Sequence, residues 1–369
     1  MKVIQALLLA SLVYACTPSQ PDEQSNPIEN IPVWTLEETI TIQETDDFIM
    51  GFVGSPLVTS KGEILLPEFR ASKIFHFDAQ GAYLGTFSQK GSGPGEINDY
   101  STAIITKDDK YVVFDRSEMR FTIFDKDNDT WKHTEMINTE TNPGQFFEGP
   151  DNTIIGRTQV SWNRRNLNEP DRGYYLRQMT YSGTILKDSL IFGPVDNFLV
   201  WETEQAFSVT SIPGGHGLTS FSEIYDENTI IHAQTDRFEF TILDIENGET
   251  RTISHDLPLV PLTPAEKDTM LAQVRSQFVN ALQDKMPEYK RAINSFFVDD
   301  VGNIWINIST PSDADVAYNW LIMDFDGKFL GKLQSPKNFT LSTSKNGLVY
   351  GMRRSNETGI TVSGFKIIK

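Results

Sequence analysis

Short apolar runs separated by turn residues recur along the chain. Within residues 59–95, three runs with strand-like spacing lie at 63–66, 73–78 and 82–87, with Gly- or Asp-containing turns between them. A Gly/Pro-rich segment at 91–95 follows the third run. A sheet of so few strands cannot bury both of its faces alone, so the fold depends on whether the unit is repeated.

The unit is repeated five more times. The later copies begin at Thr106, Gly149, Tyr225, Val298 and Ser344. Without an insertion, successive copies begin about 42 to 47 residues apart, a spacing typical of propeller blades. The sixth copy stops one strand short, and residues 33–42 have the pattern of the missing strand. We therefore predict an all-β fold, a six-bladed β-propeller whose N-terminal strand closes the last blade; an unclosed β-sandwich would explain neither the repeat nor the missing strand.

Insertions interrupt the repeat at three places. Residues 158–172 form a polar insertion and residues 196–217 a Gly-rich one. A helical insertion is predicted at about 263–292, where a capping box with Pro at the first helical position precedes apolar residues at helical spacing. The residues that define this helix are Thr263, Pro264, Glu266, Leu271, Val274, Phe278 and Leu282, with Pro287 at its end. We expect the helix to lie against the outside or the rim of the propeller.

The N-terminus has the features of an export signal. An apolar run at 3–13 follows Met1-Lys2 and is too short to span a membrane, which takes about 20 residues. It ends in Leu-Val-Tyr-Ala-Cys, which resembles a bacterial lipobox with Cys16, the only cysteine of the chain, as the acylated residue. The predicted organisation is a lipoprotein signal peptide at 1–16, a flexible polar tether at 17–32 and the propeller at 33–369. The alternative is an ordinary signal peptide with an incidental cysteine.

Charge and cysteine content narrow the possible partners. The formal net charge of −18 argues against binding nucleic acid and against lying flat on anionic lipid. After cleavage only the acylated Cys16 would remain, so the core must stabilise the fold without disulfides. We predict a monomer anchored through Cys16 in the cell envelope, in the outer membrane of a Gram-negative bacterium, with either face of that membrane possible.

Several stretches resemble known propeller repeats. Residues 87–97 resemble the connector of NHL-type repeats, and 112–116 followed by 120–125 look like their core strands. Residues 286–305 and 325–331 are similar to the six-bladed β-propeller lipoproteins of bacterial envelopes, an NHL/TolB-like group. The resemblance implies this fold and this compartment. It supplies no catalytic mechanism, since most members of the group lack an assigned activity.

The candidate site is the ring of loops that follow the first core strand of each copy. Five of these six loops contain an arginine, although the protein is acidic overall. The candidate ligand-binding residues are Glu68, Arg70, Asp115, Arg116, Arg157, Trp162, Arg164, Asp236, Arg237 and Arg353. Guanidinium forks and the Trp162 ring would suit a small polar ligand, a glycan, a peptide or an envelope protein at the mouth of the channel. Equally, the arginines could pair with nearby carboxylates and only fix the loops.

No set of residues diagnostic of catalysis is present. Nucleophile-elbow, phosphate-loop and His-Glu-x-x-His motifs do not occur, and no cofactor is predicted. The alternative function is a metal-dependent hydrolase or lyase, by similarity to six-bladed lactonases and amidating lyases. Calcium or zinc would then lie at the same mouth, with Glu68, Asp115 and Asp236 as possible ligands. Residues 299–303 superficially resemble a calcium loop but are better interpreted as a tight turn of the blade, because similar segments recur in other copies.

Overall fold

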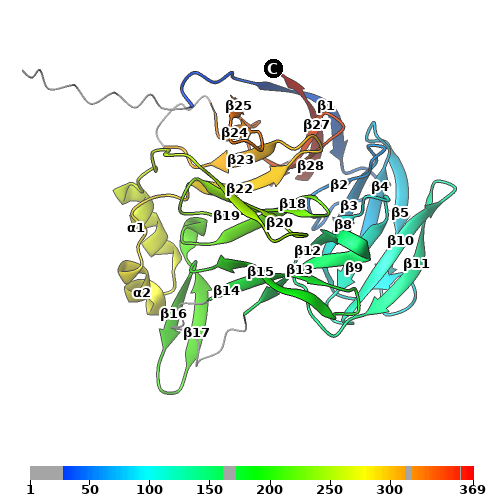
Figure 1. The fold of residues 1–369 in the computed structure, drawn as a ribbon, viewed down its shortest axis with the longest axis horizontal. Helices are drawn as coiled ribbons and strands as arrows, with labels where there is room; N and C mark the ends of the chain where they lie inside the picture. The colour runs from blue at the N-terminus through cyan, green and yellow to red at the C-terminus, as the bar shows by residue number, and fades with distance from the viewer. Residues whose placement is uncertain (1–27, 161–171, 312–317, 358) are drawn as a thin grey trace, which may run out of the picture.

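Six four-stranded antiparallel sheets are arranged as the blades of a propeller in a computed structural model, which describes residues 28–160, 172–311, 318–357 and 359–369 (Figure 1). In each blade the first strand lines the central channel and the following strands lie progressively further out, except that the N-terminal strand forms the outer edge of the sixth blade. The predicted all-β, six-bladed propeller is confirmed.

The first three blades follow one another directly along the chain. Blade one comprises β2 (Leu57–Val58), β3 (Ile64–Glu68), β4 (Lys73–Phe77) and β5 (Tyr83–Phe87). Blade two comprises β8 (Tyr100–Ile105), β9 (Tyr111–Asp115), β10 (Arg120–Asp127) and β11 (Thr130–Asn138). Blade three comprises β12 (Phe146–Gly149), β13 (Thr153–Gln159), β14 (Gly173–Met179) and β15 (Ile185–Pro194). The short parallel pair β6 (Gln89–Lys90) and β7 (Glu96–Ile97) connects blades one and two.

The larger insertions precede blade four and blade five. Blade four comprises β18 (Ser220–Asp226), β19 (Thr229–Gln234), β20 (Glu239–Asp244) and β21 (Thr250–Ser254). Blade five comprises β22 (Ile293–Val298), β23 (Ile304–Ile308), β24 (Trp320–Met323) and β25 (Phe329–Leu333). Blade six comprises β26 (Phe339–Lys345), β27 (Leu348–Ser355), β28 (Gly359–Ile368) and the N-terminal β1 (Thr35–Gln43).

Strand β1 closes the ring, as the sequence predicted. It pairs antiparallel with β28, with Ile42 opposite Val362 and Ile40 opposite Gly364. Both isoleucines are buried in an apolar cluster that joins the last blade to the first. A side chain at position 364 would meet Ile40, so Gly364 permits this close packing.

The core consists of six apolar layers, each between two consecutive blades. Successive side chains of a strand point to opposite faces. In β23, for example, Ile304 and Ile306 face blade four whereas Trp305 faces blade six. Because both faces of a blade are covered, its middle strands read as continuous apolar runs rather than as alternating ones.

The outer hairpins repeat a turn that their sequence specifies. In blade one an Asp78 carboxylate oxygen accepts hydrogen bonds from the N–H groups of Gln80 and Ala82, and Gly81 adopts a φ of +85°. In blade five Asp324 and Gly327 have the same roles. The carboxylate satisfies the turn N–H groups and glycine supplies the left-handed conformation, which explains the Asp/Gly signals in the repeat.

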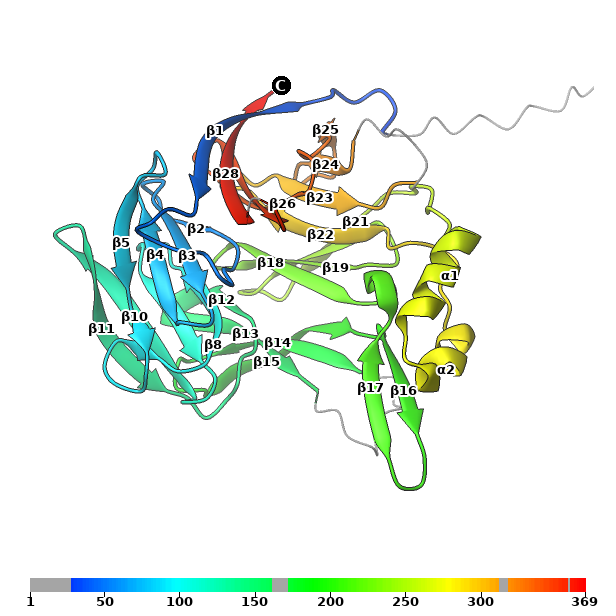
Figure 2. The ribbon, with the colours of Figure 1, turned by 180° about the vertical axis from the view of Figure 1, so that it is seen from behind.

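Two insertions form a small module beside blades three to five (Figures 1 and 2). The hairpin β16 (Phe198–Glu202) and β17 (Phe207–Ser211) packs with α1 (Pro264–Gln273) and α2 (Val279–Asp284) around a shared apolar cluster. Short 3-10 helices in the described part of the chain are η1 (Pro150–Asn152), η2 (Pro213–Gly215) and η3 (Ser276–Phe278).

The inserted helix differs from the single helix that the spacing predicts. Its predicted capping box is present, since Thr263 accepts from the Glu266 N–H and the Glu266 carboxylate accepts from the Thr263 N–H. The chain then becomes extended at Val274 and Arg275 before η3 and α2 begin. Neither helix is long enough to be stable alone, and the break lets both place apolar residues on the β16–β17 hairpin.

The N-terminal segment before β1 is fastened to blade five. The Lys332 N–H donates to the Pro32 carbonyl at 2.9 Å, and the Trp34 N–H donates to the Lys332 carbonyl at 2.8 Å. The buried Lys332 ammonium also donates to the carbonyls of Ile28 and Glu29. Residues 28–32, which the sequence assigns to the tether, thus lie against β25. Among the described residues, no helix is long and apolar enough to cross a membrane.

Candidate functional site

The loops predicted to form the site join the second and third strands of each blade. The loops occupy equivalent positions in the blades, because the end of each second strand pairs with the start of the channel strand. Tyr100 lies opposite Asp115, Ser220 opposite Gln234 and Phe339 opposite Arg353. We refer to this side of the propeller as the loop face. The blade-connecting insertions enter the channel strands on the same side.

Glu68 and Asp115 are buried and bind backbone at this face. The Glu68 carboxylate accepts from the N–H groups of Phe52 at 3.0 Å and Ala71 at 2.6 Å. Asp115 accepts from the N–H groups of Asn98 at 2.6 Å and Asp99 at 3.1 Å, and also from the following turn. Each carboxylate therefore ties the connector before its blade to the loop between the second and third strands of that blade. Their role toward a ligand stays a prediction.

Two of the predicted arginines form ion pairs with neighbouring carboxylates. Arg116 Nε lies 2.9 Å from Asp99 Oδ2, and Arg237 Nη2 lies 3.0 Å from Asp236 Oδ2. Both pairs are largely exposed, so each contributes about 1 kcal/mol or less to stability. These contacts match the loop-fixing alternative for Arg116 and Arg237. Trp162 and Arg164 lie outside the described residues.

Arg70 belongs to an aromatic group that the sequence did not reveal. The guanidinium carbons of Arg70 and Arg354 lie 5.7 and 5.5 Å from the Phe52 ring centroid. Phe52 is 48% exposed and packs against Phe69 at 5.6 Å. Arg353 stacks separately on Phe339 at 5.2 Å, with a buried Nε that has no hydrogen-bond partner among the described residues. Phe52 precedes the first blade, so it has no equivalent in the repeat.

Arg157 joins a buried polar network between blades three and four. Its guanidinium carbon lies 3.8 Å from the Tyr174 ring centroid, and burial lowers the pKa of Arg157. The Tyr174 hydroxyl lies 3.3 Å from Ser222 Oγ, which lies 2.9 Å from His232 Nδ1. Burial first, and the Arg157 charge second, lower the pKa of His232 to about 4. The imidazole is therefore neutral at physiological pH, and Ser222 and His232 are both buried, as expected for a pair that fixes the packing of two blades.

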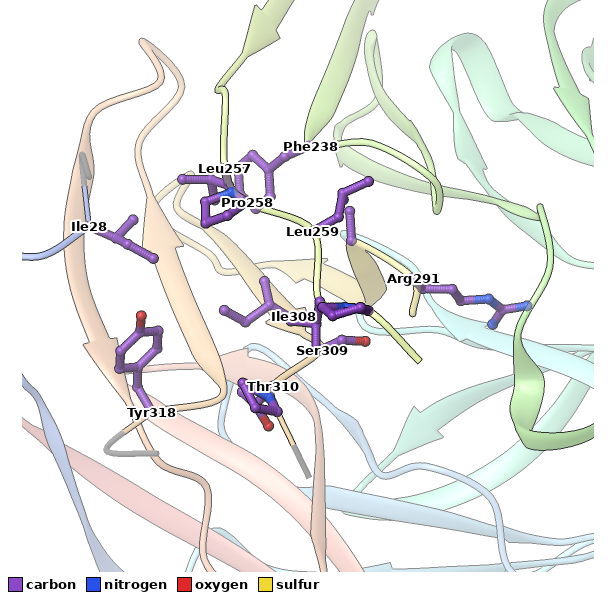
Figure 3. Close-up of a pocket in the computed structure, with 14 residues that line it drawn as sticks. Ile28, Phe238, Leu257, Pro258, Leu259, Arg291, Ile308, Ser309, Thr310 and Tyr318 are labelled. Atoms are coloured by element: carbon purple, nitrogen blue, oxygen red, sulfur yellow. The ribbon is translucent and has the colours of Figure 1, made fainter. Parts of the chain in front are cut away.

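An apolar cleft of about 280 Å³ lies between blades four and five on the loop face (Figure 3). Its walls come from the connector after β21, the end of β23 and the N-terminal segment. The lining includes Ile28, Phe238, Leu257, Leu259, Ile308 and Tyr318. Phe238 directly follows the predicted Arg237, and Thr310 and Tyr318 bound the equivalent loop of blade five, so the cleft adjoins part of the predicted mouth.

Polar groups of the cleft lie at its edges. Arg291 extends away from the other labelled side chains in Figure 3, and its Nε donates to the Gly217 carbonyl at 3.0 Å. Hydroxyl groups remain on the lining from Ser309, Thr310 and Tyr318. Burial raises the pKa of Tyr318, so its hydroxyl stays protonated. The cleft therefore offers apolar walls with hydrogen-bonding hydroxyls and no ionised group aimed into it among these labelled residues.

The central channel is a second, larger cavity of about 840 Å³. All six channel strands line it, and so do the turns at their far ends, on the side opposite the loop face. Hydrogen bonds link these turns around the opening: the N–H groups of Ser60, Lys107 and Asn346 donate to the carboxylates of Asp109, Glu148 and Asp300, respectively. The cleft and the channel share no lining residue.

Comparison with known proteins supports the fold alone. A Bacteroides fragilis NCTC 9343 protein described as exported is 11% identical, with a TM-score of 0.54 over 91% of this chain and 96% of that one. A Bacteroides caccae protein of unknown function (14%, TM-score 0.39, 77% and 81% covered) and a streptogramin B lyase (12%, TM-score 0.44, 90% and 98% covered) are less similar in structure. No protein-family model and no curated protein matches the chain.

Metal-ligand geometry is missing from the described part of the chain. No group of three or more His, Cys, Asp or Glu side chains there is placed to hold a metal ion. The 299–303 segment forms a turn in which Asp299 accepts from the N–H groups of Val301 and Asn303 and from Trp305 Nε1. Its carboxylate is therefore engaged by the turn and by a core tryptophan.

Proposed function

We propose that the protein is an exported, lipid-anchored binding module that holds a small ligand, or one side chain of a partner, in the loop-face cleft. The proposal rests on the cleft, which is concave and mostly apolar with a few hydroxyl groups at its edges. Ligand pockets usually have this composition. This lining favours a ligand with an apolar body and a polar edge over a wholly polar one.

The sequence and the position of the N-terminal segment support anchoring near this site. Ile28 forms part of the cleft wall, and eleven residues separate it from Cys16. A chain of that length spans at most about 40 Å. Acylation of Cys16 would thus hold the cleft close to a membrane surface, in line with the resemblance to propeller lipoproteins. The B. fragilis protein described as exported has the same fold, which agrees with this compartment.

The cleft is tested by the fluorescence of 1-anilinonaphthalene-8-sulfonate, a probe that brightens in apolar sites. We expect the wild-type protein to bind about one equivalent and Leu259→Asp to bind at least tenfold more weakly, because a carboxylate would stand on the apolar wall. Leu84→Asp is the matched control, since Leu84 is 55% exposed on the outer strand β5. Equal binding by both variants, or no binding by the wild type, would refute the assignment. Library compounds that raise the melting temperature of the wild type but not of Leu259→Asp then identify the ligand class.

The anchor is tested separately by metabolic labelling with an alkyne fatty acid in a Gram-negative host. We expect label on the wild-type chain and none on Cys16→Ala, because Cys16 is the only cysteine. Ser19→Ala serves as the control and keeps the label. A labelled Cys16→Ala chain, or an unlabelled wild type, would contradict the lipoprotein assignment while leaving the cleft experiment unaffected.

A further inference from the structure

Of the carboxylates that line the central channel in the described part of the chain, one has no partner there. Glu223 lies on β18 and lines the channel, and its carboxyl group forms no hydrogen bond or ion pair with any described residue. The other lining carboxylates all have partners. They are Asp109 with Ser60, Glu148 with the Lys107 N–H, Asp226 with the Asn228 N–H, Glu227 with the Lys107 ammonium, Asp299 with Asn303, and Asp300 with the Asn346 N–H.

The surroundings of Glu223 suit a positively charged ligand. Among the described residues, seven carboxylates and two ammonium groups, Lys107 and Lys345, line the channel. Lys107 is paired with Glu227. Such an excess of one charge in a confined cavity concentrates ions of the opposite sign. A second polar group is also free, because the Ser342 hydroxyl lines the same channel and is buried without a partner among the described residues.

We propose that the channel binds a small organic cation, a guanidinium or ammonium group on an apolar body, with its charge against Glu223. The cavity volume of about 840 Å³ lies within the range of ligand sites, roughly 300 to 1,000 Å³. Its walls include Leu57, Ile104, Phe147 and Ile224, against which a hydrocarbon body would be buried. A metal ion would need several converging ligands, which the described residues do not provide.

Binding of such a cation is coupled to the loss of one proton. Although water reaches the channel, protein surrounds the Glu223 carboxyl, and burial raises its pKa to about 8. At neutral pH the group is therefore mostly protonated, and it must release its proton before it can pair with a cation. Apparent affinity should rise about tenfold per pH unit below pH 8 and level off above it. Besides Glu223, the charged or titratable groups around the channel among the described residues are Lys107, Asp109, Glu148, Tyr174, Tyr225, Asp226, Glu227, Asp299, Asp300 and Lys345.

The test is calorimetric titration with n-butylguanidinium at 150 mM salt between pH 6 and pH 9. A guanidinium stays charged throughout this range, so a pH dependence reports on the protein. We expect one equivalent to bind to the wild type, with the affinity rising toward pH 8. Uncharged n-butylurea, of nearly the same shape, should bind at least tenfold more weakly.

Two variants that each lose one carboxylate distinguish binding at Glu223 from a general attraction of cations to an acidic protein. Glu223→Gln should weaken binding at pH 9 at least tenfold and remove its pH dependence. Glu37→Gln, on the exposed face of β1, should change neither. Equal affinities of the two variants at pH 9, a wild-type affinity independent of pH, or no binding to the wild type would each overturn the proposal. Because the channel and the cleft share no lining residue, none of these outcomes affects the loop-face site.

Discussion

Replacing Ile42 by Ala will lower the free energy of unfolding by about 2 to 5 kcal/mol. The Ile42 side chain is 2% exposed and lies in the apolar layer between the last and first blades. Removing three of its carbons leaves a cavity where β1 completes the ring. Each of the other layers joins blades that follow one another in sequence, whereas this layer joins the two ends of the fold. Weakening this layer will therefore favour opening of the ring in addition to destabilising the apolar core.

The measurement is equilibrium unfolding in urea, followed by tryptophan fluorescence. Trp34, just before β1, packs edge-on against Trp305 in the layer between blades five and six, with ring centroids 6.1 Å apart, so its fluorescence reports on release of the N-terminal segment. Ile49→Ala is the control, because Ile49 is 73% exposed and its truncation should cost less than about 0.5 kcal/mol. Equal losses for the two variants would show that β1 contributes no more than a surface loop and would contradict a ring closed by this strand.

The fold was predictable because the information that specifies a blade is local. Each blade carries its own turns, such as Asp78 with Gly81, and its own apolar runs, and six repetitions of a weak signal make a strong one. The position of β1 followed from counting strands. The break at Val274 was not predictable, because packing on a hairpin 70 residues away overrides the spacing of apolar residues within the helix.

The candidate site was predictable only as a region. The equivalent positions in the repeat located the loop face and the ends of the second strands, where Glu68, Asp115 and Arg353 lie. They could not show that the two carboxylates would accept from the N–H groups of Phe52 and Asn98, since these donors come from connectors outside the repeat. Nor could they reveal the cleft or the side chains that line the channel, because these walls combine segments far apart in sequence.

Glu223→Gln will make the protein more stable, and the gain will grow with pH. A glutamate with a folded pKa near 8, above the ordinary 4.5, binds more protons in the folded than in the unfolded state between these values. The wild type therefore loses stability as the pH rises through this window, at up to about 1.4 kcal/mol per pH unit. Glutamine does not titrate. The variant should match the wild type near pH 4.5 and exceed it by roughly 3 to 5 kcal/mol above pH 8.

Urea unfolding of both proteins at pH 5, 6.5, 8 and 9 measures this difference directly. Other titrating groups, including Glu148 with its own raised pKa, are present in both proteins and largely cancel. A difference that stays constant from pH 5 to pH 9 would show that Glu223 titrates normally and is well solvated in the channel. The same experiment also tests cation binding. If Glu223 pairs with a bound cation, saturating n-butylguanidinium at pH 9 should raise the free energy of unfolding of the wild type and leave that of the variant unchanged. The gap between the two proteins would then narrow, because the ligand replaces the solvation that burial removes from Glu223.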